Sequence, residues 1–165
     1  MRYAMPLMDT ILAILLWLAP YDPPSRLEER ARVIARATGN AEEQAILIAV
    51  DFCETTFGRR GIPFGVTEGY AARQRAIQEA RRNHTTVPPA YTADDGARSI
   101  LNIIRRFGPW CQRPRQSREM HWARVLGFFH SGDYCRADPY SASESRLVSR
   151  ILQRMRRWEE AHPGC

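Results

Sequence analysis

One carboxyl group in this chain, that of Glu54, stands where an apolar stretch ends and a glycine-rich loop begins. Residues 52–58 read FCETTFG and residues 61–67 read GIPFGVT. A carboxyl group half-shielded by apolar neighbours there can keep its proton at neutral pH, because burial penalises the charged form. A protonated acid at the edge of a cleft can cleave a glycosidic bond by donating that proton. Glu54 is therefore the candidate catalytic residue, although most helix-terminal glutamates simply face water.

The element that must position Glu54 is a helix. Asn40 followed by two glutamates is an N-terminal signal, and apolar residues then recur at helical spacing as far as Thr56. Because apolar residues surround this helix on most sides, we expect it to run through the centre of the domain. Residues 58–67 contain three glycines and a proline, which indicates a shaped loop with room for a short hairpin.

Further helices are predicted from capping signals and apolar periodicity. They cover about 25–38 after a capping box at Ser25, 67–83 capped by Thr67, 93–107 after Thr92, 117–130, and a last helix from a capping box at Ser141. No segment shows the sustained alternation that is typical of a strand. The predicted fold class is mainly α, with at most a small β-hairpin near 61–66.

The N-terminal 24 residues are predicted to be separate from the domain at 25–165. Arg2 precedes an apolar run at 11–19, and the breaker Tyr-Asp-Pro-Pro follows at 21–24. The run is short for a membrane span. Three interpretations stay open: an export signal or uncleaved anchor that associates with the membrane through 11–19, a buried helix packed on the domain, or a start codon assigned too early.

Length and charge narrow the class of protein. The chain has 165 residues and 44% hydrophobic residues, which suits one folded domain and argues against disorder. Its 24 basic residues are all arginine and its net charge is +6, which indicates either a codon bias or an anionic partner. The arginines at 73, 75, 81 and 82 lie on one helix without aromatic residues between them, so nucleic acid is not expected as a partner.

Cysteine and histidine spacing gives no metal or redox motif, and we expect neither a metal nor a cofactor. Cys53 is predicted to be a small core residue. Cys111 and Cys135 flank the helix at 117–130, and they could form a disulfide only if the chain doubles back and the compartment is oxidising.

The stretch around Glu54 resembles the lysozyme-like superfamily, most closely the lytic transglycosylases that cut bacterial peptidoglycan. Residues 54–57 (ETTF) stand where that family has its Glu-Ser motif, and residues 65–67 (GVT) stand where it has Gly-Leu-Met-Gln. Residues 128–132 (FFHSG) occupy the place of the Ala-Tyr-Asn-Ala-Gly motif, and Tyr140 precedes the closing helix. The similarity covers roughly residues 40–155. The Glu-Thr-Thr string is also similar to family 19 chitinases.

The resemblance implies a lysozyme-like domain that cleaves MurNAc-GlcNAc bonds with one glutamate, which donates a proton and then accepts one. The substrate-binding residues that it implies are Thr55, Phe64, Gly65, Thr67, Phe129, His130 and Tyr140. Aromatic side chains such as Tyr70 and Tyr134 could also stack on sugars.

Glu68 and Asp133 are the candidates for a second acid, whereas Asp51, one turn before Glu54, is expected to be structural. The expected partner is the peptidoglycan glycan strand, and the expected location is the periplasm, the cell envelope or a phage particle. The alternatives are a non-catalytic lysozyme-like binding or structural component, or a chitinase-like glycosidase.

Overall fold

The computed structural model describes residues 5–59, 61–133 and 135–163, and this part of the chain is mainly helical without a strand. The predicted fold class is confirmed at that level. The helices are α1 (Met5–Leu18), α2 (Pro24–Ala37), α3 (Ala41–Thr55), α4 (Thr67–Arg82), α5 (Ala93–Phe107), α6 (Arg118–Ser131) and α7 (Pro139–Ala161), with a short 3-10 helix η1 (Pro63–Gly65) between α3 and α4.

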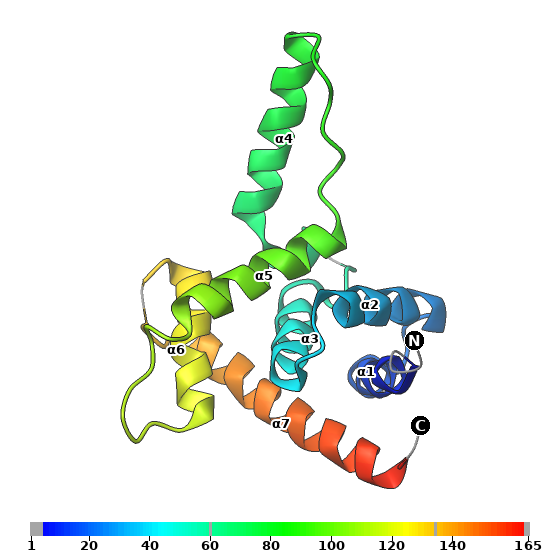
Figure 1. Cartoon of the computed structure of the whole chain (residues 1–165), viewed down its shortest axis with the longest axis vertical. Coiled ribbons are helices and arrows are strands. Elements are labelled where there is room, and N and C mark those ends of the chain that lie inside the picture. Colours follow the sequence, from blue (N-terminus) through cyan, green and yellow to red (C-terminus); the bar gives the residue numbers. More distant parts are fainter. Residues whose placement is uncertain (1–4, 60, 134, 164–165) are drawn as a thin grey trace.

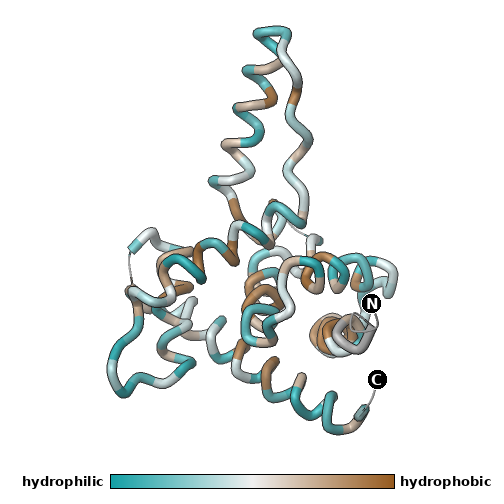
Figure 2. Tube along the Cα trace, in the orientation of Figure 1, coloured by the Kyte–Doolittle hydropathy of each residue, from teal (hydrophilic) through white to brown (hydrophobic). Residues whose placement is uncertain are grey.

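Helix α3 lies at the centre of the fold, as its apolar pattern predicts. Six consecutive residues, 45–50, have no exposed surface. The helix packs against α7, η1, α2, α5 and α1, and Figures 1 and 2 show this hydrophobic helix enclosed by the others. Asn40 caps its start by accepting a hydrogen bond from the Glu43 backbone N–H. Glu54 therefore stands in the last turn of a helix whose middle is fully buried in the domain.

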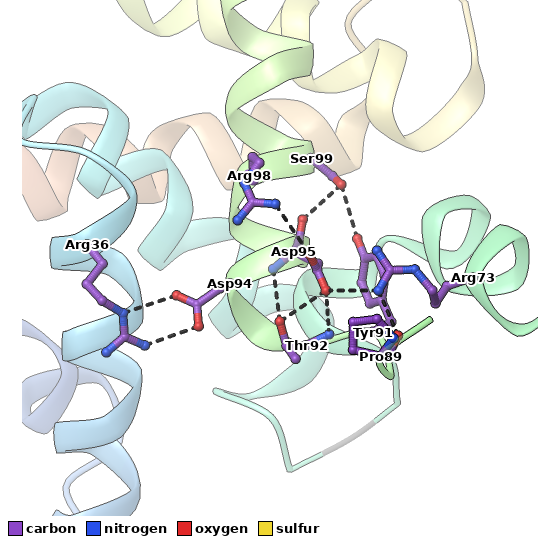
Figure 3. A network of polar contacts seen from close by, with 9 residues as sticks. All are labelled: Arg36, Arg73, Pro89, Tyr91, Thr92, Asp94, Asp95, Arg98 and Ser99. Carbon is purple, nitrogen blue, oxygen red and sulfur yellow. Dashed lines mark hydrogen bonds and ion pairs between the residues drawn. The ribbon is translucent and has the colours of Figure 1, made fainter. Parts of the chain in front are cut away.

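Helix α4 projects from the rest of the molecule as an arm, and the segment at 83–92 returns beside it (Figure 1). A polar network holds the base of the arm to α5 (Figure 3). Arg73 donates a hydrogen bond to the Pro89 carbonyl and pairs with Asp95, while the hydroxyls of Tyr91 and Ser99 share a hydrogen bond. These contacts fix the first turns of α4, which follow directly on the loop beside Glu54.

The N-terminal helix α1 packs into the body of the domain. Ile11, Ile14 and Leu15 are at most 1% exposed, and the helix lies against α2 and α7. This packing agrees with the buried-helix interpretation of the apolar run, while cleavage or membrane association of residues 1–24 stays a prediction. Among the described residues, no helix combines the length and hydropathy that a bilayer crossing requires.

The sequence allowed at most a small hairpin near 61–66, and the described residues there form no strand, since the short 3-10 helix η1 covers Pro63–Gly65. Phe64 and Gly65 both have positive φ, so the backbone turns sharply there and does not continue as a strand.

Three of the predicted caps are wrong. Pro24 starts α2 before Ser25 can cap it, since proline at the first helical position needs no donor. Thr67 is already inside α4, which has no side-chain cap. Asp138 caps α7, with Ser141 as the reciprocal partner in the capping box.

Cys111 and Cys135 form a disulfide across 24 residues, which ties the loop before α6 to the loop before α7. The entropic model of a cross-link predicts that its loss lowers the free energy of unfolding by about 3–4 kcal/mol. We expect urea denaturation of a Cys111→Ala/Cys135→Ala variant to show this decrease. Adding reductant should destabilise the wild type by a similar amount and leave the variant unchanged. A wild type that is insensitive to complete reduction would contradict the prediction.

Candidate functional site

Glu54 is half-buried, with 24% of its side chain exposed. Helix α3 ends just beyond it because Thr56, Phe57 and Gly58 all take positive φ values, which turn the chain back on itself. The turn lets η1 pack against α3. Glu54 is therefore neither enclosed in the core nor on a convex surface free of neighbours, as a catalytic acid requires.

Gly65 leaves the space that the Glu54 side chain occupies. A Cβ atom built on Gly65 would lie 2.9 Å from both Cβ and Cγ of Glu54 and 3.1 Å from its Oε2. The φ of Gly65 is +67°, which side chains other than glycine rarely adopt. The sequence predicts Gly65 as a substrate-binding residue, and the structure places it directly against Glu54.

Because of this contact, Gly65→Ala should displace the Glu54 carboxyl group and lower any reaction that depends on that group by at least about tenfold, since misplaced catalytic groups lose rate steeply. Gly61→Ala is the matched control, because Gly61 has a similar φ of +64° but nothing within 4 Å of the added Cβ. The two variants should lose similar stability in thermal denaturation. Equal rates for the two variants would show that strain alone, and not the contact with Glu54, explains the loss.

Two further polar side chains, from α6 and α7, face Glu54. Nδ1 of His130 lies 3.5 Å from Oε1 of Glu54, and Nε2 of His130 lies 2.5 Å from Oε2 of the buried Glu144. The ring of Tyr140 stands edge-on to the His130 ring, with 4.5 Å between the centroids. His130 and Tyr140, which were predicted as substrate-binding residues, are thus brought to the candidate acid.

These neighbours change one another's pKa values. Burial alone would lower the pKa of His130, but the hydrogen bond to Glu144 and the charges of Glu144 and Glu54 outweigh it and raise that pKa. Burial also raises the pKa of Glu144, against the opposing effect of His130. Burial, the charge of Glu54 and a hydrogen bond to it raise the pKa of Tyr140. The Tyr140 hydroxyl therefore keeps its proton at neutral pH.

Glu54, His130 and Glu144 all offer ligand atoms within 4.8 Å of one another, a grouping that metal sites share. The orientation of the His130 ring does not suit a metal site, however. The two ring nitrogens of His130 point to different carboxyl groups, and one imidazole cannot direct both nitrogens at a single ion. The arrangement fits a chain of polar contacts, with a hydrogen bond between Glu144 and Nε2 of His130 and a 3.5 Å contact between Nδ1 of His130 and Glu54.

Behind Glu54, a buried ion pair holds the last turn of α3. The fully buried Asp51 pairs with Arg30 at 3.0 Å, and Arg30 lies over the Phe64 ring at 5.0 Å. The Thr55 hydroxyl donates to Asp51 and accepts from the Gly58 backbone N–H. Asp51 is structural, as expected. Thr55 and Phe64 are at most 1% exposed, so they shape the site from behind and present no surface to a substrate.

A pocket of about 260 Å³ includes Gly65, the residue that lies against Glu54. Its walls include Gly65, Thr67 and Phe129 together with Glu68 at the base of the arm. The structure therefore gathers three of the predicted substrate-binding residues around one hollow that is joined to Glu54 through Gly65.

A larger pocket, of about 570 Å³, is lined by Glu43, Arg105, Trp122 and neighbouring residues. Glu43 accepts hydrogen bonds there from Nε and Nη2 of Arg105, which lower the pKa of Glu43. That pocket therefore offers no carboxyl group suited to donating a proton, and the hollow beside Glu54 is the better candidate.

The sequence did not identify Glu144 as part of the site, because Ser141–Glu144 matched a capping-box pattern. Its spacing was the signal that could have revealed it, because Glu144 stands four residues before Val148 and seven before Ile151, on the apolar face of the last helix. Cys53 is exposed rather than a core residue. Neighbouring atoms still shield its thiol group from part of the solvent, and this desolvation, together with the charges of Glu144 and Glu54, raises its pKa to about 12. It is thus a poor nucleophile. Tyr134 lies outside the described residues.

Of the two candidates for a second acid, Glu68 lines the pocket, while Asp133 is exposed and pairs with Arg136. Tyr70 packs edge-on against Tyr91 at the base of the arm. Neither Asp133 nor Tyr70 is among the residues that face Glu54.

Comparison of the chain with protein-family models, with curated proteins and with solved structures found no match.

Proposed function

We propose that this protein cleaves the MurNAc-GlcNAc bonds of peptidoglycan glycan strands, as a lytic transglycosylase or muramidase, with Glu54 as the single acid and base. The observation that carries the proposal is the position of Glu54: half-buried at the end of the central helix, close to His130 and Tyr140, and against Gly65. Gly65 also forms part of the wall of the 260 Å³ pocket, so that pocket begins one residue away from the Glu54 carboxyl group.

In the proposed mechanism, the Glu54 carboxyl group first gives its proton to the glycosidic oxygen as the bond to the anomeric carbon breaks. The carboxylate that forms then takes a proton from the attacking group. That group is a water molecule in a muramidase, or the 6-hydroxyl of the same sugar in a lytic transglycosylase. The Tyr140 hydroxyl, a hydrogen-bond donor beside Glu54, would hold the departing or attacking oxygen near the acid.

The disulfide supports a proposal for where the reaction takes place. Disulfides persist in oxidising compartments such as the periplasm and the cell exterior, and the Cys111–Cys135 bond suits both. The net charge of +6 would attract an anionic wall. Together these features support a location in the cell envelope or outside the cell, where peptidoglycan is present.

The proposal is tested by following the turbidity of purified peptidoglycan and the masses of the released fragments. Clearing that depends on Glu54 supports the proposal. Fragments that end in an anhydro sugar would identify a lytic transglycosylase, and fragments that gain one water would identify a muramidase. Retention on peptidoglycan without clearing would overturn the enzymatic proposal in favour of a binding protein. Cleavage of chitin oligomers alone would overturn the choice of substrate.

A further inference from the structure

The inference concerns the pair His130 and Glu144, which lies behind Glu54. Glu144 is 1% exposed, and its Oε2 lies 2.5 Å from Nε2 of His130. Its other oxygen is buried and has no hydrogen-bond partner among the described residues. A buried carboxyl group with a single partner is costly in free energy. The hydrogen bond to His130 is therefore the polar contact through which Glu144 can act.

This hydrogen bond sets the chemistry of the imidazole. When Glu144 is ionised it can only accept hydrogen bonds, and Nε2 of His130 then carries the hydrogen of the bond between them. In a neutral imidazole, Nδ1 is then left with its lone pair. That nitrogen is the one that faces Oε1 of Glu54, at 3.5 Å.

We propose that Glu54 and His130 share the catalytic proton of this site, and that Glu144 positions His130 and selects the tautomer that allows the sharing. The proposal deepens the proposed function and rests on it, because the shared proton is the one that Glu54 would deliver to the glycosidic oxygen. His130 and Glu144 are positioning residues, since they act through Glu54.

The sharing is a balanced proton transfer. With the proton on His130, the imidazolium stands between two carboxylates. On transfer, the Nδ1–H bond breaks and leaves its electron pair on nitrogen, while an O–H bond forms at Oε1 of Glu54. Glu54 becomes a carboxylic acid, His130 becomes neutral, and the charge of the three groups together is unchanged. The 3.5 Å separation requires only a small closing movement, as is common for catalytic hydrogen bonds before substrate binds.

The surroundings favour coupling of the two groups. The side chain of His130 is 15% exposed, and the rings of Phe129 and Tyr140 stand edge-on to it. Limited access of water strengthens the interaction between charges. The titratable groups that act on this cluster come from α3, from the N-cap of α7 and from α7 itself: Cys53, Glu54, Asp138, Tyr140 and Glu144.

The experiment is a pH titration of the free protein by NMR with ¹⁵N-labelled histidine, in the wild type, Glu144→Gln and Glu54→Gln. The chain has four histidines, and loss of one signal in His130→Asn assigns the resonances of His130. We expect the neutral form of His130 to carry its hydrogen on Nε2. We expect its pKa to fall by about one unit or more in Glu144→Gln, and to fall in Glu54→Gln, since a nearby opposite charge shifts a pKa by about 1–3 units.

His121 is the internal control. It is the other buried histidine, and its Nδ1 shares a hydrogen bond with Gln116. Its titration should be the same in all three proteins. A hydrogen on Nδ1 in neutral His130, or a His130 pKa that does not change in either variant, would overturn the proposal.

A second measurement connects the pair to catalysis. The rate of peptidoglycan clearing should fall towards alkaline pH with an apparent pKa that belongs to the pair. In Glu144→Gln and His130→Asn this alkaline fall should begin about one pH unit lower. Clearing that needs Glu54 but keeps its pH profile in both variants would overturn the inference and leave the proposed function intact. If no protein clears peptidoglycan, the proposed function fails, and the NMR titration still decides whether the two groups share a proton.

Discussion

Glu54→Gln is expected to lower the rate of glycan cleavage by about 10²–10⁴-fold, the usual contribution of general acid–base catalysis. Glutamine has nearly the same shape as glutamate, so the contact with Gly65 is preserved. It cannot, however, donate a proton to a leaving oxygen and then recover it. The measurement is the initial rate of turbidity loss on purified peptidoglycan, with thermal denaturation to confirm that the fold is unchanged.

Glu160→Gln is the matched control for this variant, because Glu160 is an exposed glutamate near the end of α7. It should clear peptidoglycan at the wild-type rate. Glu68→Gln and Asp133→Asn examine the two residues that the sequence offers as a second acid. A single-acid mechanism predicts that each keeps most of the activity, whereas a large loss in either would indicate a second catalytic carboxylate. If Glu54→Gln retains more than about a tenth of the wild-type rate, the proposed role of Glu54 is wrong.

Asp51→Ala is expected to lower the free energy of unfolding by about 3–5 kcal/mol, because it leaves the buried Arg30 without its counter-charge. It also removes the side-chain acceptor of the Thr55 hydroxyl, which holds the backbone N–H of Gly58. Urea denaturation at neutral pH is the measurement. The double variant Arg30→Met/Asp51→Asn is the control, since removal of both charges avoids the isolated buried ion. It should be clearly more stable than Asp51→Ala, and equal losses in the two proteins would contradict the argument.

The Asp51 carboxyl group should also make the stability of the fold depend on pH. Burial raises the pKa of Asp51 to about 6, against the opposing effects of Arg30 and Thr55, from an ordinary value of 3.8. A carboxyl group whose pKa is higher in the folded state binds its proton more tightly there than in the unfolded chain. Its contribution to stability is therefore present at acid pH and is lost as the pH rises from about 4 through about 6. Asp51→Asn should lack this component when its stability is compared with that of the wild type across that range.

The amino-acid sequence by itself determined the local elements of this protein. Apolar spacing predicted the central helix α3, and the caps at Asn40 and Thr92 fall where the structure has them. The placement of Glu54 between that helix and a glycine-rich turn also follows from neighbours along the chain. Signals of this kind depend on contacts within a few residues, which a sequence displays directly.

Only the tertiary structure decided what surrounds Glu54. His130 and Glu144 come from α6 and α7, far along the chain from α3, and packing of the three helices brings their side chains together. The disulfide between Cys111 and Cys135 and the burial of α1 depend on the same long-range packing. The resemblance to a known family had pointed to His130 and Tyr140, but residue types and spacing alone do not establish which side chains touch, because such contacts depend on how whole helices fit against one another.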